Sequence, residues 1–149
     1  ISSTYIRTLI AQGEMERAME FLGHPHILTD RVGHGKRLGS TLGFPTVNLH
    51  FPEGVLVPAH GVYVTRVRFQ DGTSRPAVTN IGVRPTVDDG DRVNVEGYIL
   101  DFSGDLYGQV IRMEFYKKLR GERKFPSLEA LRDEIMKNAQ ETWDYFQPG

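Results

Sequence analysis

Thr46 and Asn48 are the first residues in this sequence whose types and spacing could do chemistry. They alternate with Val47 and Leu49 and follow Pro45, which stiffens the chain. Residues two apart on a strand point to the same side, so the hydroxyl and the amide would share one face. A hard cation such as Mg²⁺ takes few protein oxygens and keeps water and phosphate as its other ligands. The pair is therefore either a magnesium site or two polar side chains that face solvent on an edge strand.

A glycine-rich, basic segment precedes this pair and reads GHGKRLGSTLG over residues 33–43. Glycines together with cations are typical of phosphate binding. The segment matches neither the G-x-x-x-x-G-K-[ST] pattern of P-loop proteins nor the dinucleotide fingerprint, because its G-x-G-x-x-x-G spacing is one residue too long. The alternative is a flexible hairpin loop in which the glycines permit positive φ, and Lys36 and Arg37 are simply solvated.

Glu96 is a candidate general base. It interrupts the otherwise apolar stretch VNVEGYIL, in which Asn94 and Tyr98 share its face of the strand. A carboxylate in a partly desolvated cleft can accept a proton from a reacting hydroxyl. The alternative is a surface glutamate, as most glutamates are.

Helix signals mark both ends of the chain. Residues 1–23 predict two short helices, with hydroxyl N-caps at the start and glycines at 13 and 23. Near the C-terminus, FPSLEALRDEIMKNAQETWDYF predicts one amphipathic helix with Ser127 as its N-cap. The apolar residues expected to face the core there are Leu128, Leu131, Ile135, Met136, Ala139, Trp143 and Phe146.

Residues 27 to about 117 predict strands. Alternating stretches such as GVYVTRVRF are separated by turn clusters, with a hairpin expected at Asp71-Gly72 and a second tight turn near Ser103-Gly104. Several short strands with no helix between them indicate an antiparallel barrel or sandwich. The fold class is therefore mainly β.

The composition is that of one ordinary globular domain of 149 residues. A net charge of −1 argues against a dedicated nucleic-acid binder. The absence of cysteine excludes disulfides and thiolate metal sites and is compatible with a reducing cytosol. No apolar run approaches the roughly 20 residues of a membrane span, and no signal-peptide pattern opens the chain. We therefore expect a cytoplasmic protein with neither a nucleic-acid nor a membrane partner.

Taken together, these segments resemble the riboflavin kinase family, in particular the kinase half of bacterial bifunctional FAD synthetases. The stretch LGFPTVN at residues 42–48 is similar to the family's Pro-Thr-Ala-Asn motif, with Val47 in the alanine position. Five further pieces follow in the family's order, and the similarity covers about residues 27–147. They are GVY at Gly61, NIGVRPT at Asn80, VEGYILDF at Val95, DLYGQVIRMEF at Asp105 and LRGERKFPSLEAL at Leu119.

The resemblance implies a small antiparallel Greek-key β-barrel with a C-terminal helix. It also implies ATP-dependent phosphorylation of riboflavin at the ribityl 5′-hydroxyl to give FMN and ADP. Glu96 would be the catalytic base, and Thr46 and Asn48 would position Mg²⁺. The residues expected to bind ATP are Gly33, His34, Gly35, Lys36, Arg37, Gly39, Ser40, Gly43, Thr46 and Tyr98. Those expected to contact the flavin are Leu119, Arg120 and Phe125.

The N-terminal stretch ISSTYIR looks like the last motif of the adenylyltransferase half of the bifunctional enzymes. We therefore expect residues 1–23 to be a helical remnant of that half with its linker, and residues 24–149 to be the kinase domain. In the full-length protein, an N-terminal FMN adenylyltransferase domain would be a further partner. The sequence departs from the family at Ser40, where a basic residue is common, and at Gly97 and Tyr98, where VEVH or VETH is usual.

Two other functions fit a small barrel. One is an FMN-binding barrel without kinase activity, which would have no need of Thr46, Asn48 and Glu96 together. The other is a nucleic-acid-binding barrel, which the charge and the lack of a basic-aromatic stripe disfavour.

Overall fold

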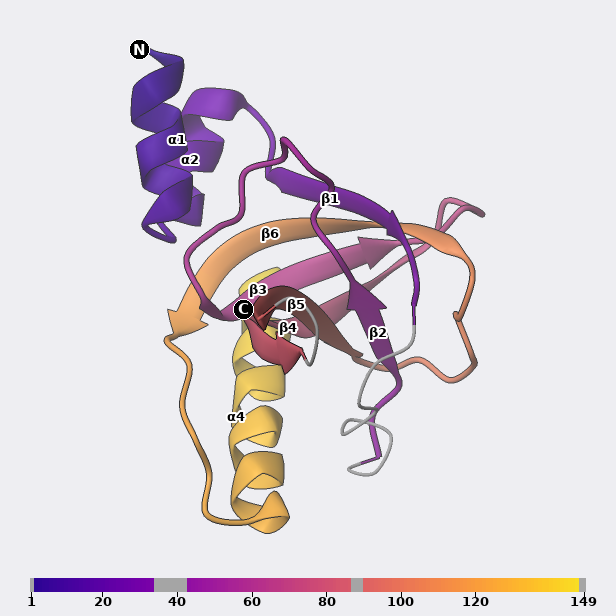
Figure 1. Ribbon diagram of the computed structural model, residues 1–149. Helices are drawn as coiled ribbons and strands as arrows, with labels where there is room; N and C mark the ends of the chain where they lie inside the picture. The colour runs from indigo at the N-terminus through magenta and orange to yellow at the C-terminus, as the bar shows by residue number, and fades with distance from the viewer. Residues whose placement is uncertain (1, 34–42, 87–89, 148–149) are drawn as a thin grey trace.

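The computed structural model describes residues 2–33, 43–86 and 90–147 (Figure 1). Most of the described chain is in one antiparallel sheet, so the mainly β prediction is confirmed. Its strands are β1 (His26–Arg31), β2 (Thr46–Leu49), β3 (Gly61–Arg68), β4 (Ser74–Thr86), β5 (Gly90–Ile99) and β6 (Val110–Arg120). The helices of the described residues are α1 (Ser3–Ala11), α2 (Met15–Leu22) and α4 (Leu128–Phe146). Among these, no helix is long and apolar enough to cross a bilayer.

The sheet has the strand order β1-β6-β3-β4-β5-β2. Strands β3, β4 and β5 pair in sequence, and β6 returns to pair with β3, which is the Greek-key arrangement. The sheet curls until its two edges approach each other (Figure 1). There the Gly33 amide donates to the Asn48 carbonyl at 2.9 Å, and the His50 amide donates to the Asp30 carboxylate at 2.8 Å. The predicted barrel is therefore confirmed, with its edges joined by these contacts.

Alternation along the strands divides the apolar residues between two cores. Inward-facing residues such as Val47 and Val95 fill the barrel, together with Leu9 and Ile10 of α1. Outward-facing residues of the same strands, Tyr98 among them, belong to a second cluster between the sheet and α4. The outer face of β2 and β5 is thus partly covered, which makes it a place where polar side chains can be buried beside a cavity.

The helix and hairpin predictions are largely confirmed. Ser2 caps α1 by accepting from the Tyr5 amide at 3.3 Å, and α2 ends at Gly23, whose φ of +81° is left-handed. Ser127 caps α4 by accepting from the Ala130 amide at 3.1 Å. The hairpin between β3 and β4 turns at Asp71-Gly72, where the Asp71 carboxylate accepts from the Thr73 amide at 2.9 Å.

The predicted core face of α4 is partly wrong. Ile135 and Ala139 are buried as expected, but Leu128 and Met136 are 51% and 52% exposed. The helix turns Asn138 and Thr142 toward the sheet instead; both are buried. The Thr142 hydroxyl donates to the Asn138 carbonyl at 2.8 Å, and the Asn138 amide is fully engaged with charged neighbours, so this polar side is tolerated.

His26 is a half-buried histidine that ties β1 to the segment before β3. Because a carbonyl can only accept, its Nε2–H donates to the Leu56 carbonyl, 2.9 Å away, while the ring stacks on Phe51. Burial lowers the pKa of His26, against the raising effect of this hydrogen bond, and nearby His24 lowers it further.

We expect acidification to destabilise the barrel through His26. The pKa of His26 is lower in the folded protein than in the unfolded chain, so the unfolded chain binds the proton more tightly. The contribution of His26 to stability is therefore fully present well above pH 6.5 and is lost as the pH falls below that value. Urea unfolding at pH 7.5 and 5.5 should show a smaller loss of unfolding free energy in His26→Gln than in the wild type. His60→Gln, which removes an exposed histidine that does not act on His26, should lose as much as the wild type; equal losses in all three proteins would contradict the prediction.

Candidate active site

A row of polar side chains crosses three strands on the outer face of the sheet. Asn48 of β2 is directly opposite Glu96 of β5, and Glu96 is in turn opposite Asn80 of β4. One step along, Thr46 is opposite Tyr98. Side chains that are directly opposite in antiparallel strands share a face, with Cβ atoms about 5 Å apart. The pairing therefore brings together Thr46, Asn48 and Glu96, which the sequence proposed separately.

Glu96 opens onto a cavity of about 290 Å³ between the sheet, the segment after β6 and the start of α4. Polar groups and apolar groups share its lining. From the strands come Asn80, Gly82, Asn94, Glu96, Tyr98 and Arg120, with the apolar Val62, Val78 and Val83; from the segment after β6 come Glu122, Arg123 and Phe125; and α4 adds Leu131 and Ile135.

Asn48 and Thr46 line a second cavity of about 210 Å³. Val32, Gly33 and Pro45 form part of its wall, and residues 104–107 form the rest. Since Asn48 and Glu96 are cross-strand neighbours, the two cavities lie on either side of this one pair. A group held in one cavity could therefore react with a group held in the other.

Glu96 is buried, with 7% of its surface exposed, so the alternative of a surface glutamate is wrong. The Tyr98 hydroxyl donates to its Oε1 at 2.6 Å. Burial raises the pKa of Tyr98, and the charge of Glu96 and this hydrogen bond raise it further, against the opposing charge of Arg120. Tyr98 therefore stays a phenol donor and fixes the orientation of the carboxylate.

Asn48 is 3% exposed, so its side chain does not face solvent on an edge strand. Its Oδ1 is buried and has no hydrogen-bond donor within the described residues. Leaving such an acceptor unsatisfied costs about 1–3 kcal/mol. No group of three or more His, Asp or Glu that could hold a metal occurs among the described residues. An amide oxygen with a nearby hydroxyl fits a cation whose remaining ligands are phosphate and water.

Asn94 and Gly82, which face each other across β5 and β4, were not identified from the sequence as site residues. Asn94 Oδ1 is the other buried acceptor that lacks a donor in the described chain. A Cβ on Gly82 would lie 1.9 Å from Glu122 Oε1, so the missing side chain admits the Glu122 carboxylate. Asn80 and Gly82 belong to the NIGVRPT motif, which was the available signal.

Arg120 and Phe125 line the first cavity as the prediction for flavin contacts requires, and Arg123, which was not predicted, joins them. The Arg120 and Arg123 guanidinium carbons lie 5.4 and 4.8 Å from the centre of the Phe125 ring. Leu119 does not line this cavity; it packs against the outer apolar cluster, of which Tyr98 is a member.

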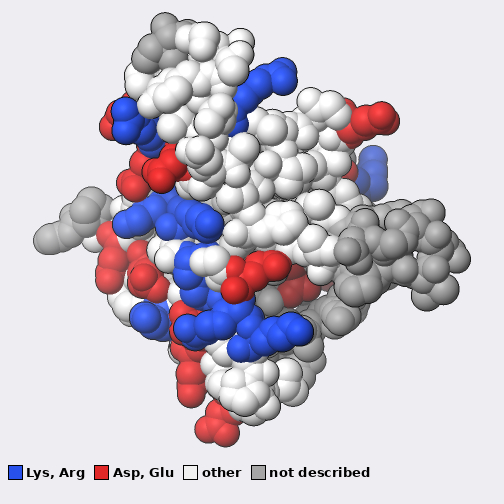
Figure 2. Space-filling view, turned by 60° about the vertical axis from the view of Figure 1, so that its left-hand side comes forward, with Lys and Arg blue, Asp and Glu red and all other residues white. Residues whose placement is uncertain are grey.

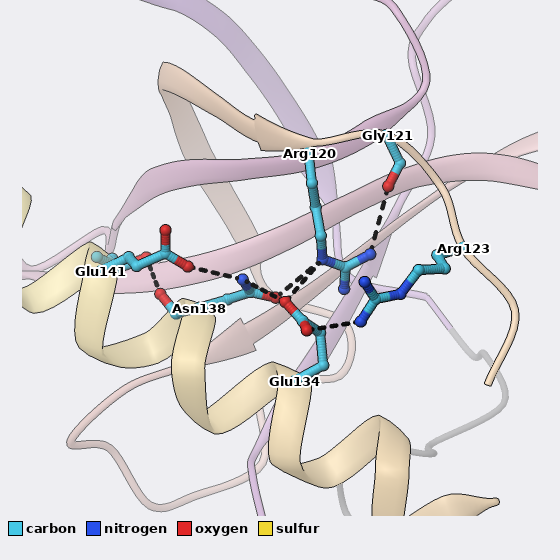
Figure 3. A network of polar contacts seen from close by, with 7 residues as sticks. Arg120, Gly121, Arg123, Glu134, Asn138 and Glu141 are labelled. Carbon is cyan, nitrogen blue, oxygen red and sulfur yellow. Dashed lines mark hydrogen bonds and ion pairs between the residues drawn. The ribbon is translucent and has the colours of Figure 1, made fainter. Parts of the chain in front are cut away.

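Charges on the molecular surface are mixed. Figure 2 shows Lys and Arg gathered on one face, with Asp and Glu directly beside them. Arg120 and Arg123 both pair with Glu134 of α4, as Figure 3 shows. Pairing of this kind gives no support to a nucleic-acid-binding surface.

Much of the predicted ATP-binding segment is not described. His34, Gly35, Lys36, Arg37, Gly39 and Ser40 lie outside the described residues. Gly33 lines the second cavity, whereas Gly43 lines a separate groove with Phe44 and Trp143. The ATP-binding role of these residues stays a prediction.

Residues 22–146 match the family model described as riboflavin kinase (Flavokinase). The chain belongs to the riboflavin kinase family. The bifunctional riboflavin kinase/FMN adenylyltransferase of Bacillus subtilis (strain 168) is 38% identical over 148 residues, covering 98% of this chain and 46% of that protein. The chain thus spans about half the length of the curated relatives that it matches.

Two solved structures are similar to this member of the family. Riboflavin kinase from Trypanosoma brucei gives a TM-score of 0.60 at 30% identity, covering 83% of this chain and 81% of that chain. A protein from Streptococcus pneumoniae described as a macrolide-efflux protein gives a TM-score of 0.89 at 33% identity, covering 97% of this chain and 47% of that chain. The family resemblance predicted from the sequence is confirmed.

We expect Tyr98→Phe to lower the free energy of unfolding by about 1–3 kcal/mol, because the buried Glu96 carboxylate loses its donor. In a Glu96→Gln background the same change should cost less, because hydrogen bonds to charged acceptors are the stronger ones. Urea unfolding of the four proteins of this double-mutant cycle measures the difference. An equal loss in both backgrounds would mean that the two side chains are not coupled.

Proposed function

We propose that this chain is the riboflavin kinase part of a bifunctional FAD synthetase, which transfers the γ-phosphoryl group of ATP to the ribityl 5′-hydroxyl of riboflavin. Family membership supports the reaction class. The single observation that supports the mechanism is the Asn48–Glu96 pair, with one cavity on each side. We also propose a cytoplasmic location and, in the longer protein, an FMN adenylyltransferase partner domain.

The first cavity would hold riboflavin, with its 5′-hydroxyl directed at Glu96. Apolar groups such as Phe125, Leu131 and Ile135 suit the flavin ring, and polar groups from β4 and β5 suit the ribityl hydroxyls. The Glu96 carboxylate, oriented by Tyr98, would accept the hydroxyl proton as the O5′–Pγ bond forms. The bond from Pγ to the bridging oxygen breaks at the same time, and ADP leaves.

The second cavity would hold the ATP phosphates. Thr46 and Asn48 would hold Mg²⁺, with the buried Asn48 Oδ1 as the amide ligand that lacks a partner in the described chain. The ion would supply charge neutralisation on the phosphate oxygens. Gly33, whose backbone is tied to β2, would let the phosphates approach closely, and residues 34–42 would complete the binding site.

The FMN-binding barrel without kinase activity is the alternative, and one assay separates the two. The purified chain is incubated with riboflavin, ATP and Mg²⁺, and FMN is measured by HPLC, with EDTA as the metal-free control. Metal-dependent FMN supports the kinase. Tight FMN binding without FMN formation would favour the alternative.

In the same assay, Glu96→Gln should lower kcat by about 10²–10⁴-fold, because the amide cannot accept the proton. The KM for riboflavin should change little, since the side chain keeps its shape. Glu114→Gln is the matched control, because Glu114 is also a buried glutamate of the sheet but lines neither cavity. Wild-type turnover in folded Glu96→Gln would remove Glu96 as the base.

Asn48→Ala should raise the Mg²⁺ concentration for half-maximal rate by about tenfold or more, which corresponds to about 1.4 kcal/mol of lost binding. Calorimetry of ADP binding at varied Mg²⁺ gives a readout that does not depend on turnover. Asn94→Ala removes the other orphan amide, which lies in the first cavity, and should leave the Mg²⁺ requirement unaltered. An unchanged Mg²⁺ titration in Asn48→Ala would exclude metal contact there.

A further inference from the structure

Glu134 is a charged residue of α4 that does not line either cavity but contacts two residues of the first one. Its Oε2 lies 3.3 Å from Arg120 Nε, and its Oε1 lies 2.6 Å from Arg123 Nη2 (Figure 3). One carboxylate therefore pairs with Arg120, the last residue of β6, and with Arg123, three residues later. Both guanidinium groups lie close to the Phe125 ring, so the same contact fixes the aromatic wall.

Asn138, one helical turn after Glu134, orients this carboxylate. It is 1% exposed, and its side-chain oxygen and nitrogen are both hydrogen-bonded to charged side chains. Its Oδ1 accepts from Arg120 Nε at 3.3 Å, and its Nδ2 donates to Glu134 Oε2 at 3.1 Å and to Glu141 Oε1 at 3.0 Å. An apolar residue at this position would bury more hydrocarbon. Since a buried ion pair is weak evidence for stability, a positional role accounts better for the arrangement.

Arg120 lines the same cavity as Tyr98 and Glu96. Arg120 is close enough to Tyr98 for its charge to lower the pKa of that phenol, which donates to Glu96. Partial burial raises the pKa of Glu134, but the hydrogen bond from Arg123 and the charges of both arginines outweigh it, so the pKa lies below its usual value. Glu134 is thus ionised wherever the enzyme would work, and the contact persists at neutral pH.

We infer that Glu134, oriented by Asn138, is a positioning residue for substrate binding, which holds Arg120, Arg123 and Phe125 as one preformed wall of the riboflavin cavity. The inference rests on the proposed function, because it assigns the wall to riboflavin. It predicts that Glu134 acts on riboflavin binding, whereas Glu96 acts on the chemical step.

The test compares Glu134→Gln with the wild type. Glutamine keeps the shape but lacks the charge and presents an amide donor to one arginine, so the wall should loosen. We expect the Kd for riboflavin, measured by flavin fluorescence without ATP or metal, and the KM to rise about tenfold. The kcat at saturating riboflavin should stay within about threefold of the wild type. Glu134→Asp, which keeps the charge on a shorter side chain, should be intermediate.

Asp133→Asn is the matched control, because it makes the same charge change at an exposed neighbouring position of α4. The Kd, KM and kcat of Asp133→Asn should equal those of the wild type. A drop in kcat with an unchanged Kd in Glu134→Gln would overturn the inference, as would a wild-type Kd. If Glu134→Gln fails to fold, Glu134→Asp is judged by the same criteria.

A ligand-free measurement separates this inference from the proposed function. Trypsin cleaves after Arg120 and Arg123, and mass spectrometry measures the cleavage rate at each. Cleavage should be several times faster in Glu134→Gln than in the wild type and in Asp133→Asn. Equal rates would mean that Glu134 does not hold this wall, whether or not the protein makes FMN. If the wild type makes no FMN, the proposed function fails, while the cleavage comparison still tests the wall.

Discussion

The pairing of β2 with β5 is the constraint on which the site depends. Because side chains alternate along a strand, a slip of one residue would turn Asn48 into the barrel and expose Val47 and Leu49. Both apolar residues are fully buried, and burying each contributes about 1.5–3 kcal/mol. The core therefore holds the register that sets Asn48 opposite Glu96. The position of these two polar side chains is determined mainly by apolar packing on the other face of the same strands.

Gly97 shows how the core and the site share one strand. A Cβ at this position would lie 2.9 Å from Met113 Cε and 3.1 Å from Val47 Cγ2, inside the barrel. The departure from the family at this residue is thus an adjustment of core packing. Its neighbour Tyr98 points to the other face and supplies the donor to Glu96. The two adjacent departures therefore act on opposite faces of β5, one on packing and one on the carboxylate.

The features that the sequence predicted best are those that residues adjacent in the chain determine. Caps such as Ser127 and the Asp71-Gly72 turn are set by neighbouring backbone groups, and alternation alone placed Thr46 and Asn48 on one face. Periodicity failed on α4, because it treats every polar residue as solvent-facing and could not anticipate that partners distant in sequence would bury Asn138. Arg123 and Gly82 were missed for the same reason, since their roles depend on Glu134 and Glu122, which only the folded chain brings to them.

The degree to which buried polar groups are satisfied changes across the site. Asn138, at its outer edge, has its side-chain oxygen and nitrogen both engaged by protein. Glu96 accepts from Tyr98 through one oxygen, and Asn48 Oδ1 has no donor within the described residues. Buried polar atoms without partners destabilise a fold, so they persist where something other than the protein completes them. The unsatisfied atoms are therefore the positions at which we propose that substrates and cation bind, and the satisfied ones belong to the support that holds those positions in place.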